Sequence, residues 1–153
     1  MHVVYLALRL SASTGVIGNT CGAPDLKQDF DINLYTGLWY EFARSESIPF
    51  EDGDCVTAQY SLDGSAVDVL NSQYFPATDE LDSAEGIAHC SSYVSGRCGV
   101  KFNFFQPYGR YDVLDTDYET YTIVYSCTPI LADAFNIEYL WILSRKPLAE
   151  GSI

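Results

Sequence analysis

The sequence predicts an all-β domain, an eight-stranded antiparallel up-and-down barrel. Aromatic residues make up 14% of the 153 residues, and the twelve tyrosines and eight phenylalanines among them favour pleated, half-buried surfaces. From Gly37 onward, short apolar runs alternate with turn residues at roughly 8–12-residue spacing, and no long segment has a helical period. Closure removes exposed strand edges, which favours a barrel over a sandwich of two sheets.

Turn residues separate the expected strands. Asp63-Gly64 is a strong hairpin signal between the second run and the third. Pro107 and Gly109 separate the fifth run from the sixth, and residues 115–120 turn the sixth run into the seventh. The expected strands cover residues 37–46, 55–62, 66–74, 82–90, 98–106, 110–116, 120–127 and 137–144.

Alternation within the runs predicts which side chains face the interior. Because the polar side chains at alternate positions stay in water, the apolar set between them faces inward. Small inner residues leave space, and polar groups on an otherwise apolar wall are typical of a small-molecule site. Polar residues satisfied near the mouth of the barrel are the alternative. The inner set comprises Val56, Ala58, Tyr60, Val67, Val69, Asn71, Gly86, Ala88, Val100, Phe102 and Phe104.

The charge balance limits the kinds of partner. The chain has 21 acidic and 8 basic residues, a formal net charge of −13, so it would repel nucleic acid and anionic membrane surfaces. No apolar run approaches the roughly 20 residues of a spanning helix. Residues 1–20 resemble a weak or partial signal peptide, residues 21–147 form the expected barrel domain, and residues 148–153 are a short tail.

The cysteines indicate an oxidising compartment. Five cysteines in one small domain suggest disulfides, and the odd number leaves one of them over or pairs it outside the chain. No Cys-x-x-Cys pair is present, and His2 and His89 are far apart in the sequence, so no metal site is expected.

Three motifs in order carry a family resemblance. "GLWYEFARS" at residues 37–45 resembles the G-x-W signature of lipocalins, and "TDYETYTIVYSC" at residues 116–127 resembles their T-D-Y signature. Arg145, directly after "WILS", stands where lipocalins have a basic residue that covers the opening tryptophan. Over about residues 21–147 the chain is similar to the subgroup of apolipoprotein D and the insect bilin-binding lipocalins.

The resemblance implies a secreted, extracellular carrier of small apolar molecules such as lipids, fatty acids, sterols or retinoids. Ligands would enter at the open end, opposite the opening tryptophan. The implied barrel base consists of Gly37, Trp39, Asp117 and Arg145, with the guanidinium of Arg145 over the indole. The resemblance places Tyr60, Asn71, Phe102 and Trp141 in the pocket wall, and alternation adds Val69, Phe104 and Tyr139.

The resemblance also bears on the cysteines and the tail. It implies a Cys21–Cys127 disulfide, and Cys90 and Cys98 flank a hairpin that they could close, which leaves Cys55 free. Lipocalins usually place a long helix against the barrel after the eighth strand, and the residues that follow Arg145 are too few to form it. The eighth strand, apolar on both faces, is therefore expected to be partly uncovered, which suits a homodimer or association with a lipid particle.

Two other functions compete with a lipid carrier. One lipocalin branch isomerises a prostaglandin with a strand cysteine, but Cys55 has no histidine or cation beside it in the sequence to form a thiolate, so we expect no enzymatic activity. A pigment-binding lipocalin subunit, holding a bilin or a carotenoid, is the alternative, because tyrosine-rich walls suit a conjugated ligand. No resident cofactor is expected.

Overall fold

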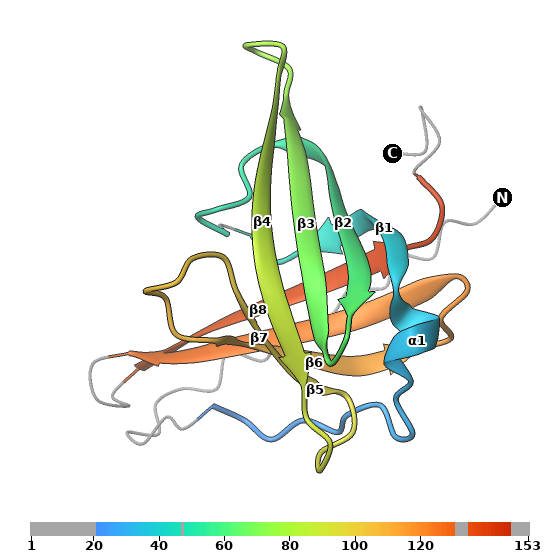
Figure 1. Cartoon of the computed structure of the whole chain (residues 1–153). Coiled ribbons are helices and arrows are strands. Elements are labelled where there is room, and N and C mark those ends of the chain that lie inside the picture. The colour runs from blue at the N-terminus through green and yellow to red at the C-terminus, as the bar shows by residue number, and fades with distance from the viewer. Residues whose placement is uncertain (1–20, 47, 131–134, 148–153) are drawn as a thin grey trace, which may run out of the picture.

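The computed structural model describes residues 21–46, 48–130 and 135–147, which form a closed antiparallel barrel (Figure 1). Each strand pairs with the next in the chain, and β1 also pairs with β8. This confirms the predicted eight-stranded up-and-down barrel. The elements are α1 (Ile32–Tyr35), β1 (Gly37–Arg44), β2 (Asp54–Asp63), β3 (Ala66–Phe75), β4 (Glu80–Cys90), β5 (Arg97–Lys101), β6 (Gly109–Thr116), β7 (Tyr121–Ile130) and β8 (Phe135–Ser144).

Strand β5 is shorter than the sequence predicts. It ends at Lys101, whereas the apolar alternation suggested a strand to residue 106. The backbone N–H of Gln106 donates to the side chain of Asn103 at 2.8 Å, which turns the chain there. Phe104 is consequently 85% exposed, and the expectation that it faces the interior is wrong.

The segment before β1 closes one end of the barrel. Asp31 caps α1, because its side chain accepts a hydrogen bond from the backbone N–H of Asn33 at 2.9 Å. The helix places Tyr35 under the barrel, where its side chain is buried. Beside it, the backbone N–H of Lys27 donates to the carbonyl of Val113 at 2.9 Å and ties the N-terminal segment to β6.

Two disulfides cross-link the described part of the chain. Cys21 is bonded to Cys127, which ties the N-terminal segment to β7. Cys90 is bonded to Cys98 across the β4–β5 hairpin. Cys55, at the start of β2, is the free cysteine among the described residues, and it is exposed.

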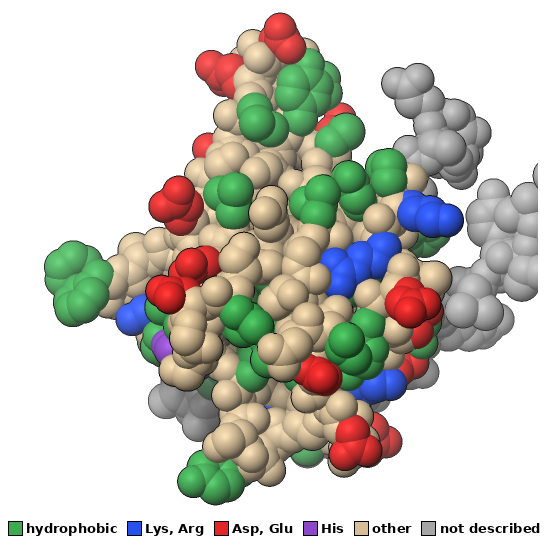
Figure 2. All heavy atoms as spheres, turned by 45° about the vertical axis from the view of Figure 1, so that its right-hand side comes forward, with side chains coloured by type: hydrophobic (Ala, Val, Ile, Leu, Met, Phe, Trp, Pro, Cys, Tyr) green, Lys and Arg blue, Asp and Glu red, His purple; other side chains and the backbone are tan. Residues whose placement is uncertain are grey.

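The surface carries dispersed negative charge. Figure 2 shows acidic side chains scattered over one face of the molecule, with hydrophobic side chains between them. In the part of the chain that the structure describes, no helix has the length and apolar character needed to cross a membrane. The expected leader at residues 1–20 and the short tail at 148–153 lie outside the described residues.

Candidate functional site

The floor of the barrel is built from the opening tryptophan and the arginine that follows β8. Trp39 is fully buried, and the guanidinium carbon of Arg145 lies 3.7 Å from the centroid of its ring. Gly37 has φ +99°, and a Cβ at this position would lie 3.2 Å from Nη1 of Arg145. A glycine is therefore required where the chain passes the guanidinium.

Arg145 also binds the backbone that surrounds it. Its guanidinium donates hydrogen bonds to the carbonyls of Leu38 at 3.0 Å, Thr36 at 2.9 Å and Tyr118 at 2.9 Å. These contacts join the start of β1 to the turn between β6 and β7. One side chain thus bonds two segments of the chain together at this end of the barrel.

Asp117 holds the turn between β6 and β7. Its carboxylate accepts hydrogen bonds from the backbone N–H groups of Glu119 at 3.1 Å, Thr120 at 2.7 Å and Tyr121 at 3.1 Å, and from the hydroxyl of Thr120. These bonds, with that of the Thr120 hydroxyl as the largest cause, lower the pKa of Asp117 to about 2. Asp117 therefore acts on the turn itself, and Arg145 binds the Tyr118 carbonyl beside it.

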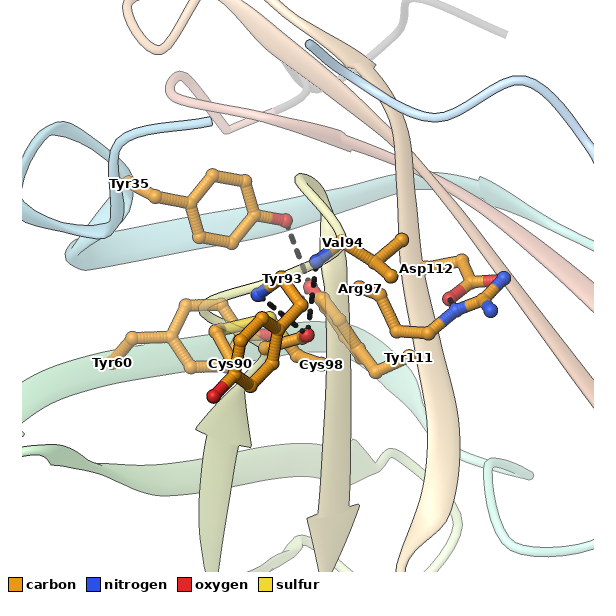
Figure 3. The surroundings of a disulfide bond; sticks show 10 residues. Tyr35, Tyr60, Cys90, Tyr93, Val94, Arg97, Cys98, Tyr111 and Asp112 are labelled. Atoms are coloured by element: carbon orange, nitrogen blue, oxygen red, sulfur yellow. Dashed lines mark hydrogen bonds and ion pairs between the residues drawn. A yellow bond between two sulfur atoms is a disulfide. The ribbon is translucent and has the colours of Figure 1, made fainter. Parts of the chain in front are cut away.

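Three tyrosine hydroxyls meet above the floor. The hydroxyl of Tyr111 lies 2.8 Å from that of Tyr35 and 3.0 Å from that of Tyr60, and Tyr35 also bonds to the Thr122 hydroxyl at 3.1 Å. Figure 3 shows the three rings converging near the Cys90–Cys98 disulfide. Burial raises the pKa of Tyr35 to about 12 and raises the pKa of Tyr60 and Tyr111 as well. The three phenols are therefore neutral hydrogen-bonding groups at physiological pH.

A cavity of about 440 Å³ lies inside the barrel, within the range of small-molecule sites. Of the residues predicted from the sequence to contact a ligand, all but one line it. Phe104 is the exception, because it lies within the turn of residues 103–106 with its side chain in solvent. The predicted residues that line the cavity are Tyr60, Val69, Asn71, Phe102, Tyr139 and Trp141.

Small side chains in the wall account for part of the cavity volume. Ala58 on β2 and Ala88 on β4 both line the cavity, as their alternation indicates. Gly86 does not add room, because a Cβ there would lie 2.8 Å from the ring of Phe102. The ring of Phe102 therefore occupies the space beside this glycine.

Aromatic side chains on β8 line another part of the cavity. The rings of Tyr139 and Trp141 are 5.8 Å apart, and the ring of Phe50, from the loop after β1, lies 5.7 Å from that of Tyr139. The indole N–H of Trp141 donates to the carboxylate of Glu51 in the same loop at 2.8 Å. This bond attaches the β1–β2 loop to the cavity wall.

The cavity wall contains polar groups that the sequence analysis missed. Glu41 and Glu51 both line the cavity. Glu41 could have been found by alternation, because it is two residues from Trp39 on the same strand and so faces the same side. Glu51 lies in a loop, where no periodic pattern indicates direction.

The chain matches the family model of the lipocalin-like domain over residues 30–152. The match covers most of the chain, and the barrel with its closed base agrees with it. The chain belongs to the lipocalin-like family. Its cavity and its family together support binding of a small hydrophobic ligand.

Proteins similar to this lipocalin occur in vertebrates, in an insect and in a bacterium. Apolipoprotein D of Bos taurus is 37% identical over 95% of this chain and 81% of its own length. The Lazarillo protein of Schistocerca americana is 39% identical over 77% of this chain and 56% of its own length. Among solved structures, insecticyanin from the tobacco hornworm Manduca sexta superposes with a TM-score of 0.73 at 27% identity, covering 88% of this chain and 73% of that one.

Proposed function

We propose that this lipocalin takes up a small hydrophobic molecule at the end of the barrel opposite Trp39 and carries it without chemical change. The observation that carries the proposal is the apolar cavity of about 440 Å³ above a closed floor. Eight-stranded barrels are wide enough to hold one small ligand. We infer ligand contacts at the lining residues Tyr60, Val69, Asn71, Phe102, Tyr139 and Trp141.

The position of the free cysteine supports a carrier rather than an enzyme. A catalytic thiol has to reach the bound ligand. Cys55 is exposed at the start of β2, and it is not among the described residues that line the cavity. We therefore expect Cys55→Ala to bind ligands as the wild type does.

The site of action that we propose is extracellular. Two disulfides in one small domain are typical of proteins that fold in an oxidising compartment. The relation to apolipoprotein D supports the same location and a lipid, a sterol, a retinoid or a fatty acid as ligand. The outer side of β8, with the half-buried Leu140 and Ile142, supports contact with a second copy or a lipid particle.

Filling the cavity tests the proposal. Ala58→Phe places a ring inside the barrel, whereas Gln59→Phe places the same ring on the outer face of the same strand. We expect Ala58→Phe to weaken binding of the neutral dye Nile red at least tenfold and Gln59→Phe to leave it unchanged, as measured by fluorescence titration. Equal binding by both variants would place the ligand outside the barrel, and the carrier proposal would fail.

A coloured ligand is the second candidate. The wall is rich in aromatic rings, which pack well against a conjugated molecule, and the structural similarity to insecticyanin is consistent with this choice. Native mass spectrometry and an absorption spectrum of protein purified from its natural source would distinguish the two. A bound mass with a visible band indicates a pigment, and a bound mass without one indicates a lipid.

A further inference from the structure

Two glutamates line the cavity, one from a strand and one from a loop. Glu41 belongs to β1, and Glu51 belongs to the segment between β1 and β2. Building on the proposed function, we propose that the ligand has a hydrogen-bond-donating head group without negative charge, an alcohol or a protonated amine, and that Glu41 and Glu51 bind this head group.

One carboxylate oxygen of Glu41 accepts a hydrogen bond from the protein, and the other has no donor among the described residues. Its Oε1 accepts a hydrogen bond from Nη1 of Arg44 at 2.7 Å. Its Oε2 is buried and has no hydrogen-bond partner among the described residues, and the whole side chain is only 11% exposed. A buried carboxylate oxygen without a donor is costly, so a donor on the ligand would stabilise the complex.

Glu51 places a second negative charge near the first. Its Oε2 accepts from the indole N–H of Trp141, which fixes the carboxylate at the wall. Burial raises the pKa of Glu41, and the charge of Glu51 and a side-chain hydrogen bond to Glu51 raise it further, while the charge and hydrogen bond of Arg44 act in the opposite direction. The charge of Glu51 also raises the pKa of Tyr60, in addition to the larger effect of burial.

A neutral hydrogen-bond acceptor also lines the cavity. Asn71 lines the cavity, and its side-chain carbonyl oxygen is buried without a hydrogen-bond partner in the described part of the chain. Like Oε2 of Glu41, it can accept a hydrogen bond from a ligand but cannot donate one. A ligand carboxylate offers neither atom a proton, whereas a hydroxyl or an ammonium group does.

One arginine could bind a ligand of the opposite kind, with a carboxylate head group. Arg110 also lines the cavity, and it binds the carboxylate of Asp112 and the carbonyl of Gly22 at 3.1 Å. Its Nη2 is buried without a partner among the described residues. A ligand carboxylate on Arg110 would reverse the order of affinities that the two glutamates predict, so the two arrangements can be separated by experiment.

Ligands that differ only in the head group test the proposal. We would displace Nile red at pH 7.5 with dodecan-1-ol, dodecan-1-amine and dodecanoate. We expect the alcohol and the amine to displace the dye at concentrations at least tenfold lower than the carboxylate. If dodecanoate is as effective as the alcohol, or more so, the proposal is overturned.

Variants assign the preference to the two glutamates. Glu41→Gln combined with Glu51→Gln keeps the side-chain shape and removes both charges, so the advantage of the amine over dodecanoate should fall at least tenfold. Glu51→Gln alone changes a loop residue and should give part of this effect if the double variant does not fold. Glu85→Gln changes an exposed glutamate on β4 that does not line the cavity, so it is the matched control and should keep the wild-type ratio.

The outcomes separate this proposal from the carrier function. If the dye binds and all three ligands displace it equally, the carrier function stands and the head-group assignment is wrong. A preference that survives the double substitution likewise overturns the role of Glu41 and Glu51. If neither the dye nor any of the three ligands binds, both proposals fail.

Discussion

Arg145 stabilises the barrel base through its ring contact and its hydrogen bonds to backbone carbonyls. We expect Arg145→Ala to lower the free energy of unfolding by about 2–4 kcal/mol, because it removes a cation–π contact and leaves carbonyls without a donor. Urea unfolding followed by tryptophan fluorescence measures this loss. Lys146→Ala, at the next and exposed position, should change little. Equal effects of the two substitutions would contradict the role of Arg145.

Asp117 makes the turn between β6 and β7 sensitive to pH. Its folded-state pKa of about 2 lies below its ordinary value of 3.8, so its stabilising effect is complete above pH 3.8 and disappears as the pH falls toward 2. Asp117→Ala should therefore lower the urea midpoint at pH 6 and match the wild type near pH 2.

The neighbouring Glu119 provides the control for this experiment. It is exposed in the same turn, so Glu119→Ala should leave the midpoint nearly unchanged at both pH values. A difference between Asp117→Ala and the wild type that persists undiminished at pH 2 would show that the carboxylate charge is not the cause.

At the residue scale, alternation was a good guide within strands and a poor one outside them. Tyr60, Val69 and Asn71 line the cavity because they lie within long paired strands whose faces alternate regularly. Phe104 follows the same apolar pattern, but a side-chain hydrogen bond of Asn103 ends the strand before it. Glu51 could not be predicted, because the path of its loop depends on contacts such as that with Trp141.

The two disulfides differ in the length of chain that they close. Cys21–Cys127 spans 106 positions, and Cys90–Cys98 spans 8. Chain entropy alone assigns about 5 kcal/mol to the long loop and about 2.5 kcal/mol to the short one. We therefore expect the Cys21→Ser/Cys127→Ser variant to lose about twice the unfolding free energy that the Cys90→Ser/Cys98→Ser variant loses, in urea titrations without reductant. Equal losses would indicate that native-state contacts outweigh loop closure.

Element positions followed from the sequence more closely than element ends did. All eight strands were predicted in order, because turn residues such as Asp63-Gly64 interrupt regular apolar runs. Strand β7 continues through Pro129 to Ile130, beyond the predicted end at residue 127. Its pairing with β8 extends to Ile130 and Phe135, and such pairing between strands is not encoded in either strand alone.

At the scale of the whole molecule, the cavity has two groups of polar side chains that differ in charge. Near the floor, Tyr35, Tyr60 and Tyr111 satisfy one another with neutral hydroxyls. In the wall, Glu41 and Glu51 supply negative charge with an acceptor left unbound. The head-group preference proposed above therefore depends on the glutamate pair, and the tyrosine group contributes no charge to it.

The pairing of β1 with β8 determines when the barrel can close during synthesis of the chain. While the chain emerges from the ribosome, β1 can pair with β2 early, but its other edge has no neighbour until Phe135–Ser144 has been synthesised. At roughly 5–20 residues per second, that edge stays open for several seconds. Arg145, the next residue after β8, is also the one that seals the floor. The barrel of the nascent chain therefore cannot close until β8 and Arg145 have been synthesised.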